Sequence, residues 1–497
     1  MRQWPAGRQA GIGAAAVALG GAALYGATLA PGLGGTVDSA EFQQAAAGLS
    51  LVHPTGYPLY LLLAHAWIAL LPVGEVAWRV NVLSAVFGVA TLLVIYATVH
   101  YLSGSVVGAI LAAALAATHP LVWPTAVVAE VTSLNNLLVA ATLYALLRWA
   151  APVRSWPLEA PALLYGLALS HHRTSLLPAP AIALFLLWTV REGRRVTAAM
   201  VGRSLLLLAL PMLFYLYLPL RAFTTAWYTD TWANFAAEVG GASAWPVILD
   251  TLRRPLLPRV GVVAGLLASG WAGAGLVALA GLGGVLWSRS DPAGARRGGL
   301  ATPALYSLSF LIICGVMVIY DVDVIGDYLA LAALLLATWT GVGAGCWLRL
   351  TAAAPRMWRG GVPVGGVLLV LVLAGLPATQ AIAAYPQAGF HADTAPRQFW
   401  TALADREGTP AALPPATILI GGWARINELR YRQRVEGWRP DLYPVVLDDL
   451  RAGRLGLIRE WLGQGRAVYL LDPAPAVAAG YVVTPQGPLW RVERPLP

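Results

Sequence analysis

Long apolar runs follow one another through most of the first 384 residues of the chain. The runs at 205–220 and 362–384 approach or exceed the ~20 residues needed to cross a hydrocarbon core about 30 Å thick. Hydrophobic residues make up 58% of the 497 residues and charged residues only 11%, which is far more apolar than a soluble protein of this size needs. The sequence therefore predicts a polytopic α-helical membrane protein and argues against a soluble enzyme.

The chain has a net charge of +9, and all 33 of its basic residues are arginines. In a soluble protein this charge would suggest nucleic acid as a partner. No soluble stretch of the sequence combines a basic patch with interleaved aromatic residues, and most of the excess charge lies in the apolar part. We therefore expect the lipid bilayer, and no nucleic acid, as a partner, and we expect the arginines to report the topology.

The apolar runs predict about eleven transmembrane helices. The first, at 11–30, could also be a signal peptide, but its length exceeds that of a usual signal-peptide core, so we favour an uncleaved helix. The others are expected at 79–101, 104–121, 126–147, 158–170, 176–190, 204–221, 261–287, 303–320, 328–348 and 362–382. With this set, the loop arginines fall on the side of the N-terminus, as the positive-inside rule requires. We predict a multi-pass protein of the cell (plasma) membrane with a cytoplasmic N-terminus.

Two large loops are predicted on the extracytoplasmic side, at 31–78 and 222–260. The apolar stretch 57–71 in the first loop is short for a span and is flanked by prolines. We interpret it as an interfacial helix. Counting it as a span would invert the topology of everything after it.

Residues 385–497 are expected to form an extracytoplasmic α/β domain, separate from a transmembrane domain at 1–384. Strands are predicted at 416–420, 442–447 and 467–471, helices at 426–435 and 450–462, and a closing hairpin at 481–492. The Gly421-Gly422 pair after the first strand lacks the GxGxxG spacing, so a dinucleotide site is not expected there.

Most acids of the apolar part gather with histidines and arginines at the predicted outer ends of helices. A charge at mid-bilayer costs roughly 2.5–3.5 kcal/mol on insertion scales, so such groups belong around an aqueous cavity. We therefore expect an extracytoplasmic functional site. The residues are Asp38, Glu41, Glu130, Asp230, Glu238, Asp250, Asp321, Asp323 and Asp327, with His53, His119, His171 and His172 and with Arg79, Arg173 and Arg221.

Two carboxylates, Asp38 and Glu41, lie three positions apart after a glycine loop. The spacing fits a capping box, in which Asp38 caps a helix whose third residue is Glu41. A catalytic role is the alternative, because both acids precede the motif His53-Pro54-Thr55-Gly56-Tyr57-Pro58 in the same outer loop. The two roles can coexist, and the second motif could itself merely shape the entry of the interfacial helix.

The block Ser170-His171-His172-Arg173-Thr174 places three cationic or polar side chains at a helix end with no acid nearby in sequence. Guanidinium groups match the geometry of phosphate oxygens, so the block predicts a phosphate site. Taken singly, Arg79 and Arg221 are more often residues that snorkel to the membrane surface. Together with residues 171–173 they are candidates to hold a lipid phosphate.

In their order along the chain, these motifs resemble those of the GT-C glycosyltransferase superfamily. Within it the chain looks most like bacterial relatives of the transmembrane O-mannosyltransferase that modifies plexin-type immunoglobulin-like domains. The resemblance covers residues 15–345 well and the tail more loosely, and Thr55 stands where the family signature has a second proline. The motifs are Asp-x-x-Glu at 38–41, His-Pro-x-Gly-Tyr-Pro at 53–58, Arg-x-Asn-x-x-Ser at 79–84, His-His-Arg-Thr at 171–174 and Tyr-Leu-Pro-Leu-Arg at 217–221.

The resemblance implies a GT-C-type fold with a catalytic acid in the first outer loop and a polyprenyl-phosphate sugar as donor. It implies transfer of a monosaccharide, with mannose among the candidates, on the extracytoplasmic side. Asp38 matches the catalytic acid and Glu41 its partner. We hypothesise that Asp38 accepts the proton of the acceptor hydroxyl while the oxygen attacks the anomeric carbon and inverts it.

The other candidate residues support this chemistry. To the donor phosphate we assign Arg79, His171, His172, Arg173 and Arg221, and to the substrate cavity His53, Tyr57 and Glu130. Arginine can stabilise the departing phosphate without a metal, so no cofactor is required. A divalent cation remains an option, because Asp38, Glu41 and Glu130 could supply oxygen ligands. The acceptor is expected to be a protein or a glycan.

Two other classes of protein stay open. A secondary transporter or lipid-linked glycan flippase would also have many helices, but the central parts of these helices carry few ionisable residues. A glycan polymerase or ligase would share the lipid donor but not the placement of the acid in the first loop. The sequence does not identify the sugar.

Overall fold

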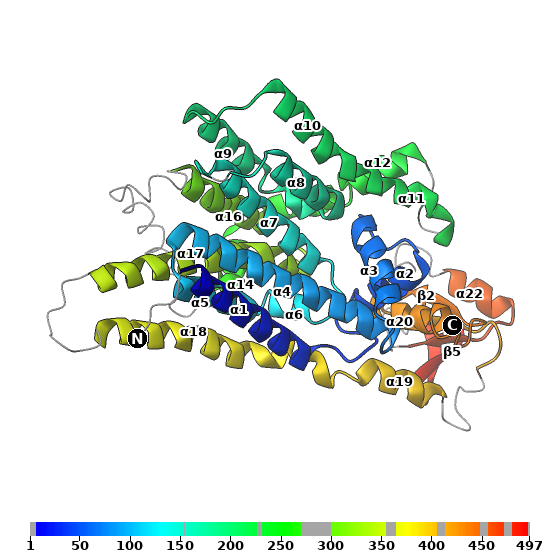
Figure 1. Cartoon of the computed structure of the whole chain (residues 1–497). Coiled ribbons are helices and arrows are strands. Elements are labelled where there is room, and N and C mark those ends of the chain that lie inside the picture. The colour runs from blue at the N-terminus through cyan, green and yellow to red at the C-terminus, as the bar shows by residue number, and fades with distance from the viewer. Residues whose placement is uncertain are drawn as a thin grey trace.

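The computed structural model describes residues 6–153, 155–225, 228, 231–269, 300–353, 364–404, 413–447, 456–471 and 480–495. A bundle of long helices is joined to a small sheet domain, and the two meet around α2 and α3 at one end of the bundle (Figure 1). The bundle helices are α1 (Ala6–Thr28), α4 (Val76–Ser103), α5 (Val106–Ala117), α6 (Trp123–Ala126), α7 (Thr132–Ala150), α8 (Glu159–His171), α9 (Ala179–Arg191), α10 (Ala198–Ala209), α14 (Leu257–Ala268), α16 (Ala301–Ile319), α17 (Ile325–Ala353) and α18 (Val364–Ala388).

Shorter helices connect or cover the bundle. The first predicted loop carries α2 (Ser39–Gly48) and α3 (Pro58–Leu70), so the helix expected at 57–71 is present. The other short helices are η1 (Arg173–Leu176), η2 (Leu210–Leu216), α11 (Tyr217–Leu220), η3 (Ala222–Thr224), α12 (Trp232–Gly240), α13 (Ala244–Leu252), η6 (Phe390–Ala392) and α19 (Ala395–Ala404).

Within the described residues, six helices are long and apolar enough to cross a membrane. They lie at Gly7–Thr28, Val76–Ser103, Arg173–Arg191, Ala198–Leu220, Ala301–Ile319 and Ile325–Leu348. The chain is a multi-pass membrane protein, as its composition predicts.

The prediction of eleven spans exceeds this count, for reasons that differ between helices. The runs at 104–121 and 158–170 form α5 and α8, but these have only 12 and 13 residues and, at about 1.5 Å per residue, are shorter than a hydrocarbon core. Helix α7 has 19 residues but starts with a polar turn at 132–136. The helix expected at 261–287 is seen as α14, and the rest of that range lies outside the described residues.

The tail forms a five-stranded sheet in the order β2-β1-β3-β5-β4. The strand β1 (Ile418–Gly421) lies parallel to β2 (Tyr443–Val446) and β3 (Val468–Leu470), whereas β5 (Leu489–Pro495) runs antiparallel to β3 and to β4 (Tyr481–Gln486). Helices α20 (Trp423–Arg434) and α22 (Gly456–Gly463) complete the domain. The predicted strands, the hairpin and the first helix are confirmed. The start of the second predicted helix falls on residues 448–455, outside the described part.

Small residues and antiparallel packing organise the bundle. A Cβ atom at Gly108 of α5 would lie 2.5 Å from the carbonyl oxygen of Gly341 in α17, so these two helices approach at backbone distance. Helices α7 and α8 pack against each other, and they run in opposite directions, because His171 at the end of α8 bonds the carbonyl of Val131 directly before α7. The first turn of α7 and the last turn of α8 therefore lie at the same end of the bundle, where α3 contacts α8 and α2 contacts α3.

Candidate active site

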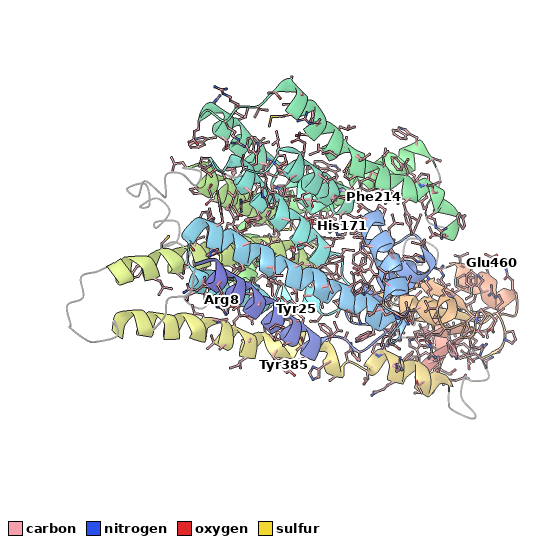
Figure 2. The ribbon with its side chains drawn as sticks, in the orientation of Figure 1. Arg8, Tyr25, His171, Phe214, Tyr385 and Glu460 are labelled. Atoms are coloured by element: carbon pink, nitrogen blue, oxygen red, sulfur yellow. The ribbon has the colours of Figure 1, made fainter. Side chains whose placement is uncertain are left out.

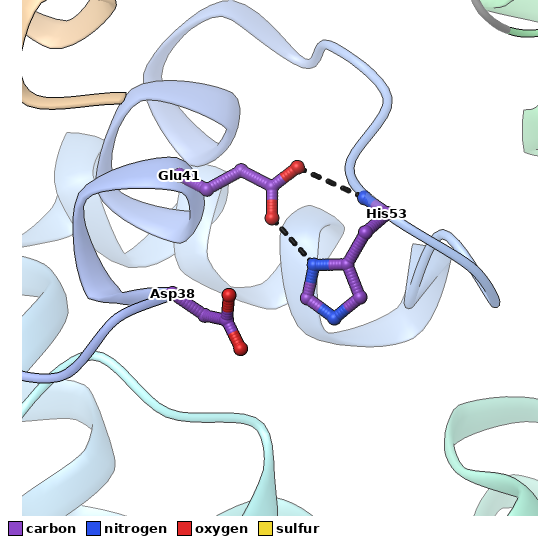
Figure 3. Close-up of side chains that lie close together, drawn as sticks. All are labelled: Asp38, Glu41 and His53. Carbon is purple, nitrogen blue, oxygen red and sulfur yellow. Dashed lines mark hydrogen bonds and ion pairs between the residues drawn. The ribbon is translucent and has the colours of Figure 1, made fainter. Parts of the chain in front are cut away.

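The carboxylate of Glu41 and the histidine of the second motif form a close pair (Figure 3). One oxygen of Glu41 accepts a hydrogen bond from the backbone N–H of His53 at 2.9 Å, and the other lies 2.5 Å from its Nδ1. The side chain of Glu41 is 5% exposed and that of His53 is 26% exposed. This pair ties the start of α2 to the loop before α3, and so brings the first two motifs together.

Burial of His53 lowers its pKa, but the adjacent carboxylate of Glu41, with weaker contributions from Asp38 and Glu130, outweighs burial and raises the pKa to about 9. His53 is therefore an imidazolium at neutral pH. Its charge partly neutralises the carboxylates around it.

Asp38 stands directly before α2, but its side chain makes no capping hydrogen bond to the helix. The hydroxyl of Ser39 instead accepts a hydrogen bond from the backbone N–H of Thr36, at 3.0 Å. The capping-box interpretation is therefore wrong, because Asp38 makes no side-chain hydrogen bond to the helix and Glu41 bonds His53 instead. Figure 3 shows the Asp38 carboxylate beside this pair.

Asp38, Glu41 and His53 each offer one potential metal-ligand atom, and these atoms lie within 4.8 Å of one another. Two carboxylates and an imidazole are a donor set that divalent first-row metals accept. The sequence pointed to Glu130 as a third ligand. In the structure Glu130 bonds elsewhere, and His53 takes its place in the cluster.

The glycine loop before Asp38 is held by two buried amides, Gln43 and Asn81. The Asn81 side chain donates to the carbonyls of Ala30 and Gly32, and its oxygen accepts a hydrogen bond from the Gln43 amide. Gln43 in turn bonds both the N–H and the carbonyl of Gly34. The sequence predicts no role for Gln43 and marks Asn81 only as part of a motif. Nothing in the sequence shows which backbone carbonyls the side-chain amide of a distant residue will bond.

Glu130 lies in the turn before α7, near the same cluster. One of its oxygens accepts a hydrogen bond from the backbone N–H of Val131 at 2.9 Å. Burial, and then the carboxylates of Asp327 and Asp38, raise its pKa above the ordinary value. His171 bonds the carbonyl of Val131 through Nε2 at 2.9 Å and so fixes this turn. Figure 2 shows His171 inside the bundle.

The Nδ1 atom of His172 accepts a hydrogen bond from the backbone N–H of Thr174 at 3.2 Å, and the hydroxyl of Thr174 lies 2.7 Å from the same nitrogen. Burial, with the nearby His171, Arg173 and His53, lowers its pKa to about 3. The neutral ring that accepts at Nδ1 carries its proton on Nε2. The ring also stacks on Tyr57, with 5.6 Å between centroids.

A cavity of about 230 Å³ lies beside this stack. Its polar wall contains Tyr57, His172 and Arg173, and its apolar wall contains Leu177 and residues of α13 and α16. The guanidinium of Arg173 also donates to the carbonyl of Glu238 at 2.5 Å, which ties the cavity to α12. The lining residues are Pro54, Thr55, Tyr57, His172, Arg173, Thr174, Leu177, Ser243, Ala244, Ile248, Val316, Met317, Tyr320 and Tyr328.

The prediction that five cationic or polar groups converge on one phosphate needs correction. Only His172 and Arg173 line the cavity, and His171 bonds a main-chain carbonyl. The guanidinium of Arg79 donates to three carbonyls around the turn after α3. The guanidinium of Arg221 donates to the carbonyls of Gly48 and Leu49 at the end of α2. Helix ends leave carbonyls without partners, and these two arginines satisfy them.

The tail domain packs directly on α2 through helix α20. The amide of Gln44 donates to the side-chain oxygen of Asn427 at 3.2 Å and accepts from Arg434 at 3.0 Å. The hydroxyl of Tyr431 accepts the backbone N–H of Ala77 at 3.0 Å. The sheet domain therefore lies against the helix that begins at the Asp38 loop.

Part of the chain matches a known domain family. Residues 38–195 match the family model described as the protein O-mannosyl-transferase TMEM260 N-terminal domain. The chain is 34% identical to the mouse (Mus musculus) protein O-mannosyl-transferase TMEM260 over 254 residues, which is 46% of this chain and 36% of the mouse protein. It is 30% identical to the Dictyostelium discoideum protein O-mannosyl-transferase tmem260 over 123 residues, which is 24% of this chain and 15% of that protein. The chain thus spans about a third or less of these relatives.

The fold is similar to that of two solved proteins over nearly the whole chain. ArnT from Cupriavidus metallidurans, in a crystal structure bound to undecaprenyl phosphate, gives a TM-score of 0.54 at 14% identity and covers 96% of this chain and 97% of that one. The Archaeoglobus fulgidus oligosaccharyltransferase, in complex with Zn and sulfate, gives a TM-score of 0.56 at 13% identity and covers 92% of this chain and 67% of that one. Residues 38–195 therefore match the TMEM260 N-terminal domain model, and the fold of the chain is similar to the folds of ArnT and the oligosaccharyltransferase.

Proposed function

We propose that this protein is a membrane glycosyltransferase that moves a monosaccharide from a polyprenyl-phosphate donor to an acceptor hydroxyl, with inversion at the anomeric carbon. The observation that carries the proposal is the position of Asp38. It lies beside the Glu41–His53 pair, and the next residues of that loop, Pro54, Thr55 and Tyr57, line a cavity with a cationic wall. The matched family region begins at Asp38 and includes His172 and Arg173.

The shape of the cavity supports a lipid-linked donor. Arg173 and His172 offer N–H donors at one wall, which suit phosphate oxygens. Leu177, Ile248 and Met317 offer an apolar wall, which suits the first isoprene units. A free nucleotide sugar would leave this apolar wall without a partner.

In the proposed reaction, Asp38 accepts the proton of the acceptor hydroxyl while the oxygen forms a bond to the anomeric carbon. The bond from that carbon to the phosphate oxygen breaks, and the electron pair leaves with the polyprenyl phosphate. The guanidinium of Arg173 and the Nε2–H of His172 stabilise the charge that develops on the phosphate. The imidazolium of His53 stays paired with Glu41 during this step and places a positive charge beside Asp38.

The sugar and the acceptor follow from the relatives. Two matched proteins are described as protein O-mannosyl-transferases, so we propose mannose as the sugar and a protein hydroxyl as the acceptor. We place the reaction on the extracytoplasmic side, because the arginine-rich turn between α9 and α10 lies toward the other end of the bundle (Figure 1). The tail domain would lie on that same extracytoplasmic side.

We propose that the reaction needs no metal, since Arg173 and His172 supply charge stabilisation and Glu41 already pairs with His53. A divalent cation at Asp38, Glu41 and His53 is the alternative. Full turnover in EDTA supports the metal-free mechanism. Loss of turnover that Mg²⁺ or Mn²⁺ restores would support the cation.

The direct test is a transfer assay with purified full-length protein in proteoliposomes, using polyprenyl-phosphate mannose labelled in the sugar and a candidate acceptor protein. We expect label to become covalently bound to the acceptor, with release of polyprenyl phosphate and inversion at the anomeric carbon. Movement of intact labelled lipid across the bilayer without transfer would instead identify a flippase. Transfer only from a preassembled glycan would identify a polymerase or ligase.

A further inference from the structure

A second cavity, of about 310 Å³, lies between α7, α8, α9 and α10. Its wall includes Leu146 and Trp149 near the end of α7, and Leu158 and Ala162 near the start of α8. The Asp38 cluster lies near the opposite ends of these two helices, where α7 begins and α8 ends. The second cavity is therefore separate from the proposed catalytic site.

The wall of this cavity is apolar almost throughout. Leucine, isoleucine, valine, proline and alanine side chains line it, together with the rings of Trp149 and Tyr165. Leu187 and Leu205 on its edge are 60% and 59% exposed, so the cavity opens on a lipid-facing surface of the bundle. A cavity with such a lining does not hold water, whereas a hydrocarbon chain from the bilayer fits it.

The rim of the cavity is basic. The guanidinium of Arg194 lies 5.6 Å from the centre of the Trp149 ring, and its Nε is buried without a hydrogen-bond partner among the described residues. Arg191 and Arg195 lie in the same turn. The one acid of this turn, Glu192, accepts a hydrogen bond from Trp188 at 2.8 Å.

We propose that this cavity binds one acyl chain of an anionic phospholipid, with the lipid phosphate at Arg194. Arg194 is half-buried at the rim, where its guanidinium lies over the Trp149 ring, and the guanidinium fork matches phosphate oxygens. Basic pockets between transmembrane helices bind anionic headgroups by the same combination of charge and apolar contact. The proposal does not depend on glycosyl transfer, because neither Arg194 nor the apolar wall touches the Asp38 cluster.

The test is lipid binding to detergent-purified full-length protein, followed by native mass spectrometry with phosphatidylglycerol, phosphatidylcholine or undecaprenyl phosphate. We expect phosphatidylglycerol to bind about tenfold more tightly than phosphatidylcholine, a difference of about 1.4 kcal/mol. Ala162→Trp fills the cavity and should abolish tight binding. The matched control Leu163→Trp lies on the same helix, where residue 163 does not line the cavity, and should leave binding unchanged.

Arg194→Gln tests the headgroup and should remove the preference for phosphatidylglycerol, whereas the control Arg459→Gln, at an exposed arginine of α22 in the tail domain, should keep it. Equal binding of phosphatidylglycerol and phosphatidylcholine to the unmodified protein would overturn the proposal. So would tight phosphatidylglycerol binding to Ala162→Trp, or displacement of that lipid by undecaprenyl phosphate. If Ala162→Trp does not fold, lipid binding to Ala162→Leu and Arg194→Gln is measured instead. Phosphatidylglycerol binding that is unchanged in both variants would overturn the proposal.

Discussion

The ring of Trp423, from the first turn of α20, meets the ring of His53 at 6.2 Å between centroids and an angle of 73°. Trp423 follows the carboxyl end of β1, so this edge of the tail sheet reaches the Glu41–His53 pair. His53 is joined to the cavity by the loop of Pro54 and Tyr57. The tail domain therefore closes the cluster on one side, while the cavity lined by His172 and Arg173 borders it on another.

This arrangement predicts that Trp423 affects the acceptor more than the donor. We expect Trp423→Ala to raise the KM for the acceptor about tenfold, equivalent to about 1.4 kcal/mol, and to leave the KM for the lipid donor unchanged. Trp438→Ala is the matched control, because Trp438 packs on Trp400 within the tail domain. Steady-state kinetics with each substrate varied in turn measure both values. A larger rise in the KM for the donor than in the KM for the acceptor would contradict the placement of the acceptor beside the tail domain.

The charge of His53 predicts a pH dependence. Its folded-state pKa of about 9 lies above the ordinary value of 6.5, so its contribution to stability is complete below pH 6.5 and is lost as pH rises through about 9. We expect the Tm of the protein to fall between pH 7 and pH 10, and His53→Gln to reduce that fall. Thermal unfolding followed by tryptophan fluorescence measures both. An identical pH profile for the two proteins would show that His53 is not charged in the folded state.

Arg173 and Arg221 should behave differently, although the sequence suggested the same role for both. Arg173→Gln should raise the KM for the donor about 10- to 100-fold, because it removes a charged hydrogen bond to phosphate. Arg221→Gln should mainly lower stability, by roughly 1–3 kcal/mol, because the carbonyls of Gly48 and Leu49 lose their donor. Donor titrations and thermal melts of both variants test this. A donor KM that rises more for Arg221→Gln than for Arg173→Gln would contradict the structure.

Asn81 should be critical for stability although it contacts no proposed substrate. Asn81→Ala leaves the carbonyl of Ala30 and the N–H of Ala129 without the hydrogen bonds that Asn81 makes to them, at about 1–3 kcal/mol for each buried group, while the carbonyl of Gly32 keeps its hydrogen bond from Gln43. We expect a large loss of folded protein in size-exclusion chromatography. Asn136→Ala is the control, because the Asn136 side-chain oxygen is buried without a partner in the described structure. Equal losses for the two variants would show that the loop does not depend on Asn81.

Periodicity and composition predicted much of the fold. The long bundle helices, the helix at 57–71 and the alternation of strands and helices in the tail follow from local patterns, and the structure confirms them. Six of the eleven expected spans are found as long apolar helices among the described residues. The runs that form α5 and α8 are apolar but too short to span, because their lengths depend on where the adjacent turns begin. Hydropathy alone does not separate a short buried helix from a span.

The candidate cluster was partly predictable. Asp38, Glu41 and His53 stood out because polar groups are rare near long apolar runs, and the structure brings them together. The contacts of Arg79 and Arg221 were not predictable, since they depend on which helix-end carbonyls lie nearby after folding. For the same reason the sequence could not show that Gln43 and Asn81 hold the glycine loop.

The measurement that tests the central claim most directly is turnover of Asp38→Asn with polyprenyl-phosphate mannose. The amide keeps the size of the side chain but cannot accept the acceptor proton, and general-base help contributes about 10²- to 10⁴-fold. We predict a fall in kcat of that size, with Tm and donor binding equal to those of the unmodified protein. Unchanged turnover in a well-folded Asp38→Asn protein would contradict the account.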